Sequence, residues 1–283
     1  MRTRSAWPAA VSGFVHRGLR ISYREYGSGP QVVVLIHGLL MDGSMFLKVA
    51  PALAARGQRV ITVDLPGHGA SDQPADMSLY SIPGFGRDVI ALLDHLGLSN
   101  AVVGGTSLGA NVGLEVAVAA PERVRGLVLE MPVLEKGIAA AGAVFVPLAL
   151  ALRLSQRGMR LVSALTRRIP RTFFLADLFI DFARRDPASS LAVLDGIIFG
   201  RVAPPLLERR RIAAPTLVIG HHSDPIHPFS DGDRTARELP RARMVEAKSI
   251  SEWRVRPDRL NAELAAFLDE VWSHPLVTGT AEG

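Results

Sequence analysis

The chain has 283 residues, of which 48% are hydrophobic and 21% are charged, so it can bury a large core and is not disordered. It contains no cysteine, which excludes disulfides, thiolate metal ligands and a cysteine nucleophile and suits the reducing cytoplasm, where we expect the protein to reside. The net charge of +5 is not laid out as a basic stripe interleaved with aromatic residues, so we expect no nucleic-acid partner.

Strand and helix patterns alternate along the chain. An antiparallel hairpin is predicted over Val11–Tyr26, with its turn near His16–Gly18. Six short runs are apolar on successive residues, as strands buried on both faces of a parallel sheet are: Val32–Ile36, Val60–Val63, Ala101–Val103, Leu127–Leu129, Thr216–Ile219 and Met244–Val245. Helical patterns fall between and after them, at Ser44–Gly57, Leu79–Gly97, Leu108–Ala120, Ser230–Leu239 and Pro257–Trp272. This alternation predicts an α/β fold with a mostly parallel sheet and helices on both faces.

One segment, residues 133–211, interrupts the alternation with helical patterns only. It leaves the carboxyl end of a predicted strand, where ligands bind in open α/β sheets, so we interpret it as a helical cap over a pocket. The predicted core is then 11–132 and 212–272, with tails at 1–10 and 273–283. The longest apolar run, Ile138–Leu152, has about fifteen residues and contains Pro147. It is shorter than the roughly 20 residues that cross a bilayer, so no stable membrane span is expected.

The strongest chemical signal is Gly105-Thr106-Ser107-Leu108-Gly109, which follows a predicted strand and opens a helix. This is the setting of a nucleophile elbow, in which a tight turn between flanking glycines lifts the serine hydroxyl clear of the sheet. Ser107 is therefore the candidate nucleophile.

A second loop follows the strand Val32–Ile36 and reads His37-Gly38-Leu39-Leu40. An oxyanion hole needs two N–H donors near the serine, and we assign them to the backbone amides of Leu39 and Leu108. His37 is expected to position this loop.

A third segment, Asp64-Leu65-Pro66-Gly67-His68-Gly69-Ala70-Ser71-Asp72, completes a set of three motifs. In order and spacing they resemble the α/β-hydrolase superfamily, over about residues 11–132 and 212–272. The resemblance implies an eight-stranded α/β-hydrolase fold with the cap inserted after strand 6. It also implies structural roles for Asp64 and His68 and, with serine at the elbow, argues against dehalogenation of haloalkanes.

The same resemblance places the catalytic acid at Asp224, in the loop after Thr216–Ile219. Such an acid fixes the tautomer of the catalytic histidine and stabilises its cation. Glu130, after the preceding strand, is a second candidate acid.

The expected catalytic histidine is missing. After the last strand the family has a Gly-His pair, but this chain has Ser251-Glu252. One hypothesis is that His227, or less favourably His222, is the general base. Another is that Glu252 takes that role, with its pKa raised by the charge of Asp224. A third is that the protein has weak or altered activity.

These observations favour a serine-nucleophile hydrolase that acts on an apolar carboxylic ester, thioester or lactone through an acyl-enzyme. The expected partner is a small apolar acyl substrate, since the predicted cap is rich in apolar residues. No cofactor and no metal is implied, and nothing in the sequence indicates an oligomeric state. The alternative is a catalytically impaired or non-hydrolytic homologue that binds a small apolar ligand.

Overall fold

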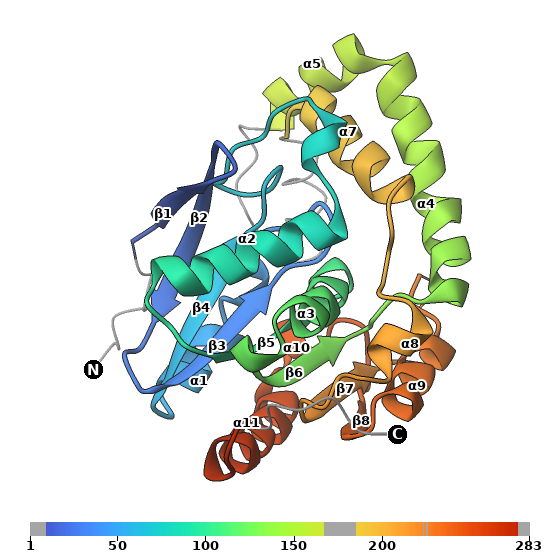
Figure 1. The fold of residues 1–283 in the computed structure, drawn as a ribbon. Helices are drawn as coiled ribbons and strands as arrows, with labels where there is room; N and C mark the ends of the chain where they lie inside the picture. The colour runs from blue at the N-terminus through green and yellow to red at the C-terminus, as the bar shows by residue number, and fades with distance from the viewer. Residues whose placement is uncertain (1–9, 167–184, 223, 225, 277–283) are drawn as a thin grey trace.

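A computed structural model of the chain describes residues 10–166, 185–222, 224 and 226–276. Its centre is an eight-stranded sheet with the order β1-β2-β4-β3-β5-β6-β7-β8 (Figure 1). The strands are β1 (Ser12–His16), β2 (Leu19–Tyr26), β3 (Gln31–Ile36), β4 (Gln58–Asp64), β5 (Ala101–Thr106), β6 (Val124–Glu130), β7 (Thr216–Gly220) and β8 (Ala242–Glu246). β2 is antiparallel to β1 and β4, and all other neighbours are parallel. The predicted α/β-hydrolase sheet is confirmed.

The hairpin turns where the sequence predicted it. Arg17 and Gly18 both have positive φ, 50° and 74°, as the two central residues of a type I′ turn require. The right-handed twist of such a turn matches that of the flanking strands, so β1 and β2 pair directly across it.

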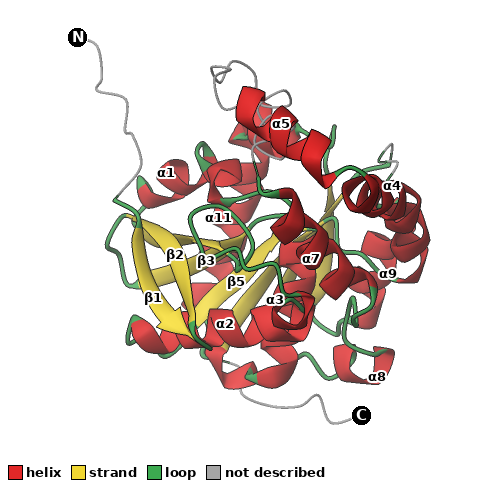
Figure 2. Cartoon of the chain, turned by 90° about the horizontal axis from the view of Figure 1, so that it is seen from above, coloured by secondary structure: helices red, strands yellow, loops and turns green. Residues whose placement is uncertain are grey.

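Both faces of the sheet are buried, which explains the apolar runs. Along β3, Val34 and Ile36 pack in one cluster with residues of α2 and α3, while Val33 and Leu35 pack in another with residues of α1 and α11. Seen from above, these helix pairs lie on opposite faces (Figure 2). Their bounds are α1 (Val49–Ala54), α2 (Ile82–His95), α3 (Leu108–Ala119) and α11 (Asp258–Ser273).

The remaining core elements are short, except for α9. They are η1 (Gly43–Phe46), η2 (Met77–Leu79), η3 (Pro121–Arg123), α9 (Phe229–Glu238) and α10 (Glu252–Val255). The single helix predicted over Ser44–Gly57 is therefore divided into η1 and α1. Leu47 and Lys48 separate the two.

Between β6 and β7 the described residues form helices and no strand. These helices are α4 (Glu135–Leu154), α5 (Gln156–Thr166), α7 (Pro187–Ile198) and α8 (Leu206–Arg209). In Figure 1, α4 and α7 lie beyond the carboxyl ends of β3, β5 and β6. Residues 167–184 of the predicted cap, and parts of both predicted tails, fall outside the described residues, and the division into core and cap stays a prediction.

Helix α4 is longer than the apolar run in the sequence. It has 20 residues with a mean hydropathy of 1.9 over its most apolar stretch, 17% of which is buried. The helix therefore has the length and composition to cross a membrane, because it extends beyond the apolar run at both ends. The absence of a stable membrane span stays a prediction. Pro147 lies inside the helix without ending it; Ala143 and Pro147 are both exposed, so water can bind the carbonyl that the proline leaves unpaired.

Candidate active site

The candidate nucleophile lies at a sharp turn between β5 and α3. Ser107 has φ 54° and ψ −110°, a conformation that side chains rarely adopt. A Cβ atom at Gly105 or Gly109 would lie 1.9 or 2.0 Å from the carbonyl oxygen of Ile36 in β3. Both positions therefore require glycine, and the turn packed against β3 sets the serine hydroxyl at the N-terminal end of α3.

Three predicted residues come together at this turn. Nε2 of His227 lies 2.8 Å from Oγ of Ser107, and Nδ1 of His227 lies 2.8 Å from Oδ2 of Asp224. The other carboxylate oxygen of Asp224 accepts hydrogen bonds from the backbone amides of Ile226 and His227, at 2.8 and 2.9 Å. These two bonds turn the loop back on itself, so the acid and the histidine three residues later face each other.

The surroundings of Asp224 stabilise its ionised form. Its side chain is almost completely buried, and burial raises its pKa. The hydrogen bonds from His227 and from the two amides outweigh burial, so the pKa of Asp224 lies below its ordinary value. Asp224 is thus a carboxylate at neutral pH and accepts the Nδ1 proton. Nε2 is then left as the acceptor for the Ser107 hydroxyl.

An apolar pocket opens above the serine. Of the residues that line it, only Ser107, Asn111 and His227 are polar, and the cavity has a volume of about 130 Å³. Leu39 and Leu108, the predicted oxyanion residues, both line this pocket. Leu108 is the first residue of α3, so its N–H has no partner within the helix.

Comparisons with known proteins place the chain in a family. A family model described as the alpha/beta hydrolase fold matches residues 31–249. The chain belongs to the α/β-hydrolase family. The enol-lactonase from Burkholderia xenovorans LB400 has a similar structure, with 25% identity and a TM-score of 0.75 over 91% of this chain and all of that chain.

Curated relatives match this chain over different lengths. Bifunctional epoxide hydrolase 2 from Sus scrofa is 38% identical over 123 residues, which are 42% of this chain and 22% of that protein. The magnesium-chelatase 30 kDa subunit from Rhodobacter capsulatus is 30% identical over 251 residues, 83% of this chain and 87% of that protein. The chain thus spans less than two thirds of the epoxide hydrolase and most of the chelatase subunit.

Glu252, a predicted base at the usual α/β-hydrolase histidine position, does not contact Ser107. Its carboxylate instead accepts hydrogen bonds from Arg259, at 2.8 Å, and from the amide of Lys248, at 2.5 Å. The bond with Arg259 is the main reason why its pKa is lowered. The expectation that its pKa is raised by Asp224 was therefore wrong.

His222 also lies away from the serine. Its ring stacks on Phe229 with a centroid distance of 3.7 Å, and Nε2 lies 3.5 Å from Glu246. Of the two histidines proposed as the base, only His227 reaches Ser107. Within the described ranges, no three His, Asp or Glu side chains gather as metal ligands would.

Glu130, the second candidate acid, lies beneath the elbow instead of beside His227. It accepts a hydrogen bond from Thr106 Oγ1 at 2.5 Å and pairs with the buried guanidinium of Arg254, which also bonds to Thr106. The backbone carbonyl of Glu130 accepts the N–H of Ser107 at 2.8 Å. The segment after β8 thus contributes a cation that supports the residue before the serine.

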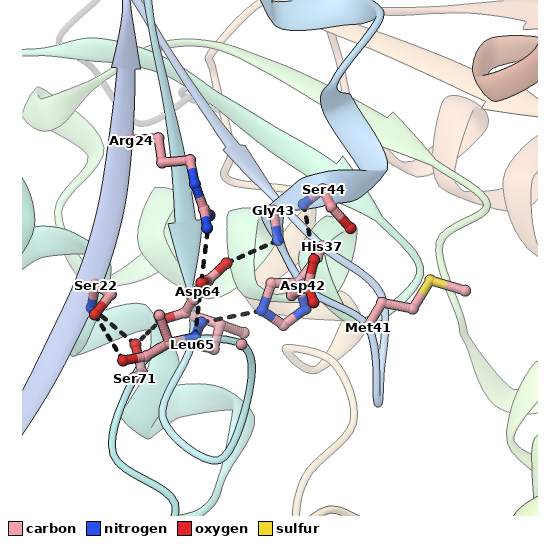
Figure 3. A network of polar contacts seen from close by, with 12 residues as sticks. Ser22, Arg24, His37, Met41, Asp42, Gly43, Ser44, Asp64, Leu65 and Ser71 are labelled. Atoms are coloured by element: carbon pink, nitrogen blue, oxygen red, sulfur yellow. Dashed lines mark hydrogen bonds and ion pairs between the residues drawn. The ribbon is translucent and has the colours of Figure 1, made fainter. Parts of the chain in front are cut away.

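The two loop motifs hold each other in place (Figure 3). Asp64 accepts hydrogen bonds from the amides of Gly43 and Ala70, at 2.7 and 2.9 Å. Nε2 of His37 accepts the amide of Leu65 at 3.0 Å, and its Nδ1 bonds to the carbonyl of Gly38. These contacts agree with the loop-shaping roles predicted for Asp64 and His37.

Two residues that sequence analysis did not single out join the inserted helices to the core. The Asn111 amide bonds to the backbone of Val133 at 2.7 and 3.0 Å and to the carbonyl of Val202 at 2.7 Å. Asp231 accepts the amides of Leu134 and Gly137 at the start of α4, at 2.8 and 2.7 Å. A polar residue one turn after the elbow serine was the available signal for Asn111; no local signal marked Asp231.

Proposed function

We propose that the protein is a serine hydrolase of apolar carboxylic esters, thioesters or lactones that works through an acyl-enzyme. The observation that supports this most directly is the continuous hydrogen-bonded series from Asp224 through His227 to Ser107, at 2.8 Å for each link between side chains. A nucleophile within hydrogen-bond reach of a base that is oriented by an acid is the arrangement that activated serines need.

In this proposal His227 moves the proton in both half-reactions. Oγ of Ser107 forms a bond to the substrate carbonyl carbon while its proton passes to Nε2 of His227. The imidazolium then gives that proton to the leaving oxygen or sulfur as its bond to carbon breaks. Water attacks the acyl-enzyme in the same way: its proton goes to His227, its oxygen bonds to carbon, and the Ser107 oxygen leaves with the proton.

The backbone amides of Leu39 and Leu108 stabilise the negative oxygen that forms during each attack. Leu39 lies on the loop held by His37, and Leu108 begins α3, whose dipole also favours negative charge at this end. Both amides belong to backbone fixed by turns, so they need little rearrangement when the charge develops.

The lining of the pocket favours an apolar acyl group. Its walls come from α4 and α7 and carry Phe145, Val146 and Ile197 among other apolar side chains. Asn111, the one polar lining residue outside the catalytic pair, uses its amide to bind backbone of Val133 and Val202. A sugar or phosphate ester would therefore lose hydrogen bonds to water without replacing them. The enol-lactonase named above is consistent with a lactone within this class.

Labelling with a fluorophosphonate tests the proposal. The unaltered protein should be modified rapidly at Ser107, S107A should not be modified, and H227A should react at least about a hundredfold more slowly, because a general base contributes roughly 10²–10⁴-fold. H222A is the matched control and should react like the unaltered protein. Equal labelling of H227A and H222A would contradict the proposed base.

A second candidate function is an accessory protein that binds an apolar ligand or partner without efficient turnover. The relative favouring it is the magnesium-chelatase 30 kDa subunit, which matches most of this chain. Slow labelling of the unaltered protein at Ser107, together with no hydrolysis of short and medium-chain nitrophenyl esters, would favour this role over the hydrolase.

A further inference from the structure

The inserted helices carry an apolar outer surface that the core does not cover. In α4, no charged residue occurs between Lys136 and Arg153. Eight large apolar side chains of α4 and α5 are exposed, and we call them the α4–α5 face: Ile138, Val144, Val146, Leu150, Leu154, Leu161, Val162 and Leu165. Both helices lie at the outer edge of the molecule (Figure 1). Several exposed apolar side chains on two neighbouring helices are typical of contact with a protein or a membrane.

The basic charge of the protein is concentrated in the same part of the chain. Residues 133–211 contain thirteen Lys and Arg against six Asp and Glu, whereas the rest of the chain contains nineteen against twenty-one. Among these cations, Lys136 and Arg160 are exposed on α4 and α5 themselves. Arg153 is also exposed but pairs with Asp195 of α7 at 2.7 Å. An apolar helical face with cations at its borders is complementary to an anionic lipid surface.

The apolar surface also continues into the pocket. Ile138 and Val146 of α4 and Ile198 of α7 line the pocket and are exposed to solvent. They therefore form an apolar part of its rim, next to the exposed apolar side chains of α4.

We propose that the α4–α5 face rests on the surface of an anionic lipid bilayer, with the pocket rim beside it. Helix α4 lies along this surface and does not cross it, because its first turn is held by Asp231 through the amides of Leu134 and Gly137. Crossing would break these bonds and remove the wall of the pocket. The bilayer is thus a place of residence for the protein and the source from which apolar molecules enter the pocket.

Sedimentation with lipid vesicles tests this proposal without any turnover. S107A protein is mixed with vesicles of phosphatidylcholine alone or with added phosphatidylglycerol. We expect binding to the anionic vesicles that weakens about tenfold when ionic strength is raised about tenfold. The L150E/L154E substitution, on the S107A background, should weaken it at least about thirtyfold, because two apolar side chains are lost from the interface and two negative charges are added.

The matched control is V15E, which places a charge at an equally exposed apolar position on β1. Val15 is 72% exposed and Leu154 is 79% exposed, so neither change should affect folding, which a thermal melt checks. V15E should bind vesicles like S107A. L150E/L154E with Ser107 retained should hydrolyse a water-soluble nitrophenyl ester as fast as the unaltered protein, because Leu150 and Leu154 do not line the pocket.

Four results would overturn the proposal: no binding to anionic vesicles at low salt, equal binding by L150E/L154E, resistance of the bound protein to alkaline carbonate, or a dimer in solution that dissociates in L150E/L154E. The third would mean that α4 crosses the bilayer, and the fourth that a second copy of the chain covers this face. Since vesicle binding needs no turnover, loss of the proposed hydrolase activity would leave this test intact.

Discussion

Replacing Asp224 with asparagine should stop catalysis while it leaves the loop folded. Oδ1 of the new side chain can still accept the amides of Ile226 and His227, which Asp224 now accepts at 2.8 and 2.9 Å. Its NH₂ group, however, takes the place of Oδ2, the atom 2.8 Å from Nδ1 of His227. That group donates to Nδ1 and so moves the ring proton to Nε2, which then faces Ser107 as a donor. A ring in this tautomer cannot remove the serine proton, and kcat should fall about 10⁴-fold.

The assay is steady-state hydrolysis of a nitrophenyl ester by the unaltered protein, D224N, H227A and the double variant. KM should change little in D224N, because Asp224 does not line the pocket. The double variant should be no slower than H227A, since the two residues act as one unit. If D224N kept activity within tenfold of the unaltered protein, or if the two substitutions added, the proposed relay would be refuted.

Three further predictions concern groups outside the relay. E252Q should leave kcat within about threefold of the unaltered value, because Glu252 bonds to Arg259 and not to the serine; hydrolysis of the same ester measures this. E130Q should lower the free energy of unfolding, measured by urea titration, by about 3–5 kcal/mol, since it leaves the guanidinium of Arg254 buried without its anion. The control is E25Q, which breaks a half-buried pair with Arg59 and should lower the free energy of unfolding by at most about 1 kcal/mol. Burial lowers the pKa of His37 and His68, so only the unfolded chain gains protons at these rings as pH falls below about 6.5. The free energy of unfolding should therefore drop by up to about 1.4 kcal/mol for each ring between about pH 7.5 and pH 5.5. An unchanged free energy of unfolding over this range would contradict their burial as neutral rings.

Most of the fold followed from local patterns. Strands buried on both faces have apolar runs without alternation, and the two clusters on either side of β3 show why. The elbow could also be predicted from a local pattern. β3 lies so close to positions 105 and 109 that both must be glycine, and these two glycines are part of the motif. The apolar run is shorter than helix α4 because it excludes Glu135 and Arg153, whose charges suit the first and last turns of a helix.

Local patterns in the sequence could not choose between the candidate bases. His222 and His227 follow β7, and Glu252 begins α10 after β8. All three lie at the correct edge of the sheet, and their distances from Ser107 depend on how the chain turns after each strand. The turn at Asp224 brings His227 over the serine, while Arg259 engages Glu252. These contacts join side chains that are far apart in the sequence, so the spacing of residues could not predict them.

The segment after β8 explains how the family's usual histidine can be absent while a relay is complete. Arg254 from this segment pairs with Glu130 and bonds to Thr106, directly under the elbow. The carboxylate of Glu130, the alternative acid, is thereby engaged by Arg254 and Thr106 and does not orient an imidazole. The proposed acid and base, Asp224 and His227, are instead three residues apart in one loop, where two backbone amides already fix the carboxylate. Because both groups come from one turn, their mutual geometry depends on that turn and not on the relative positions of two loops, so the segment after β8 is free to serve as a structural support for the nucleophile.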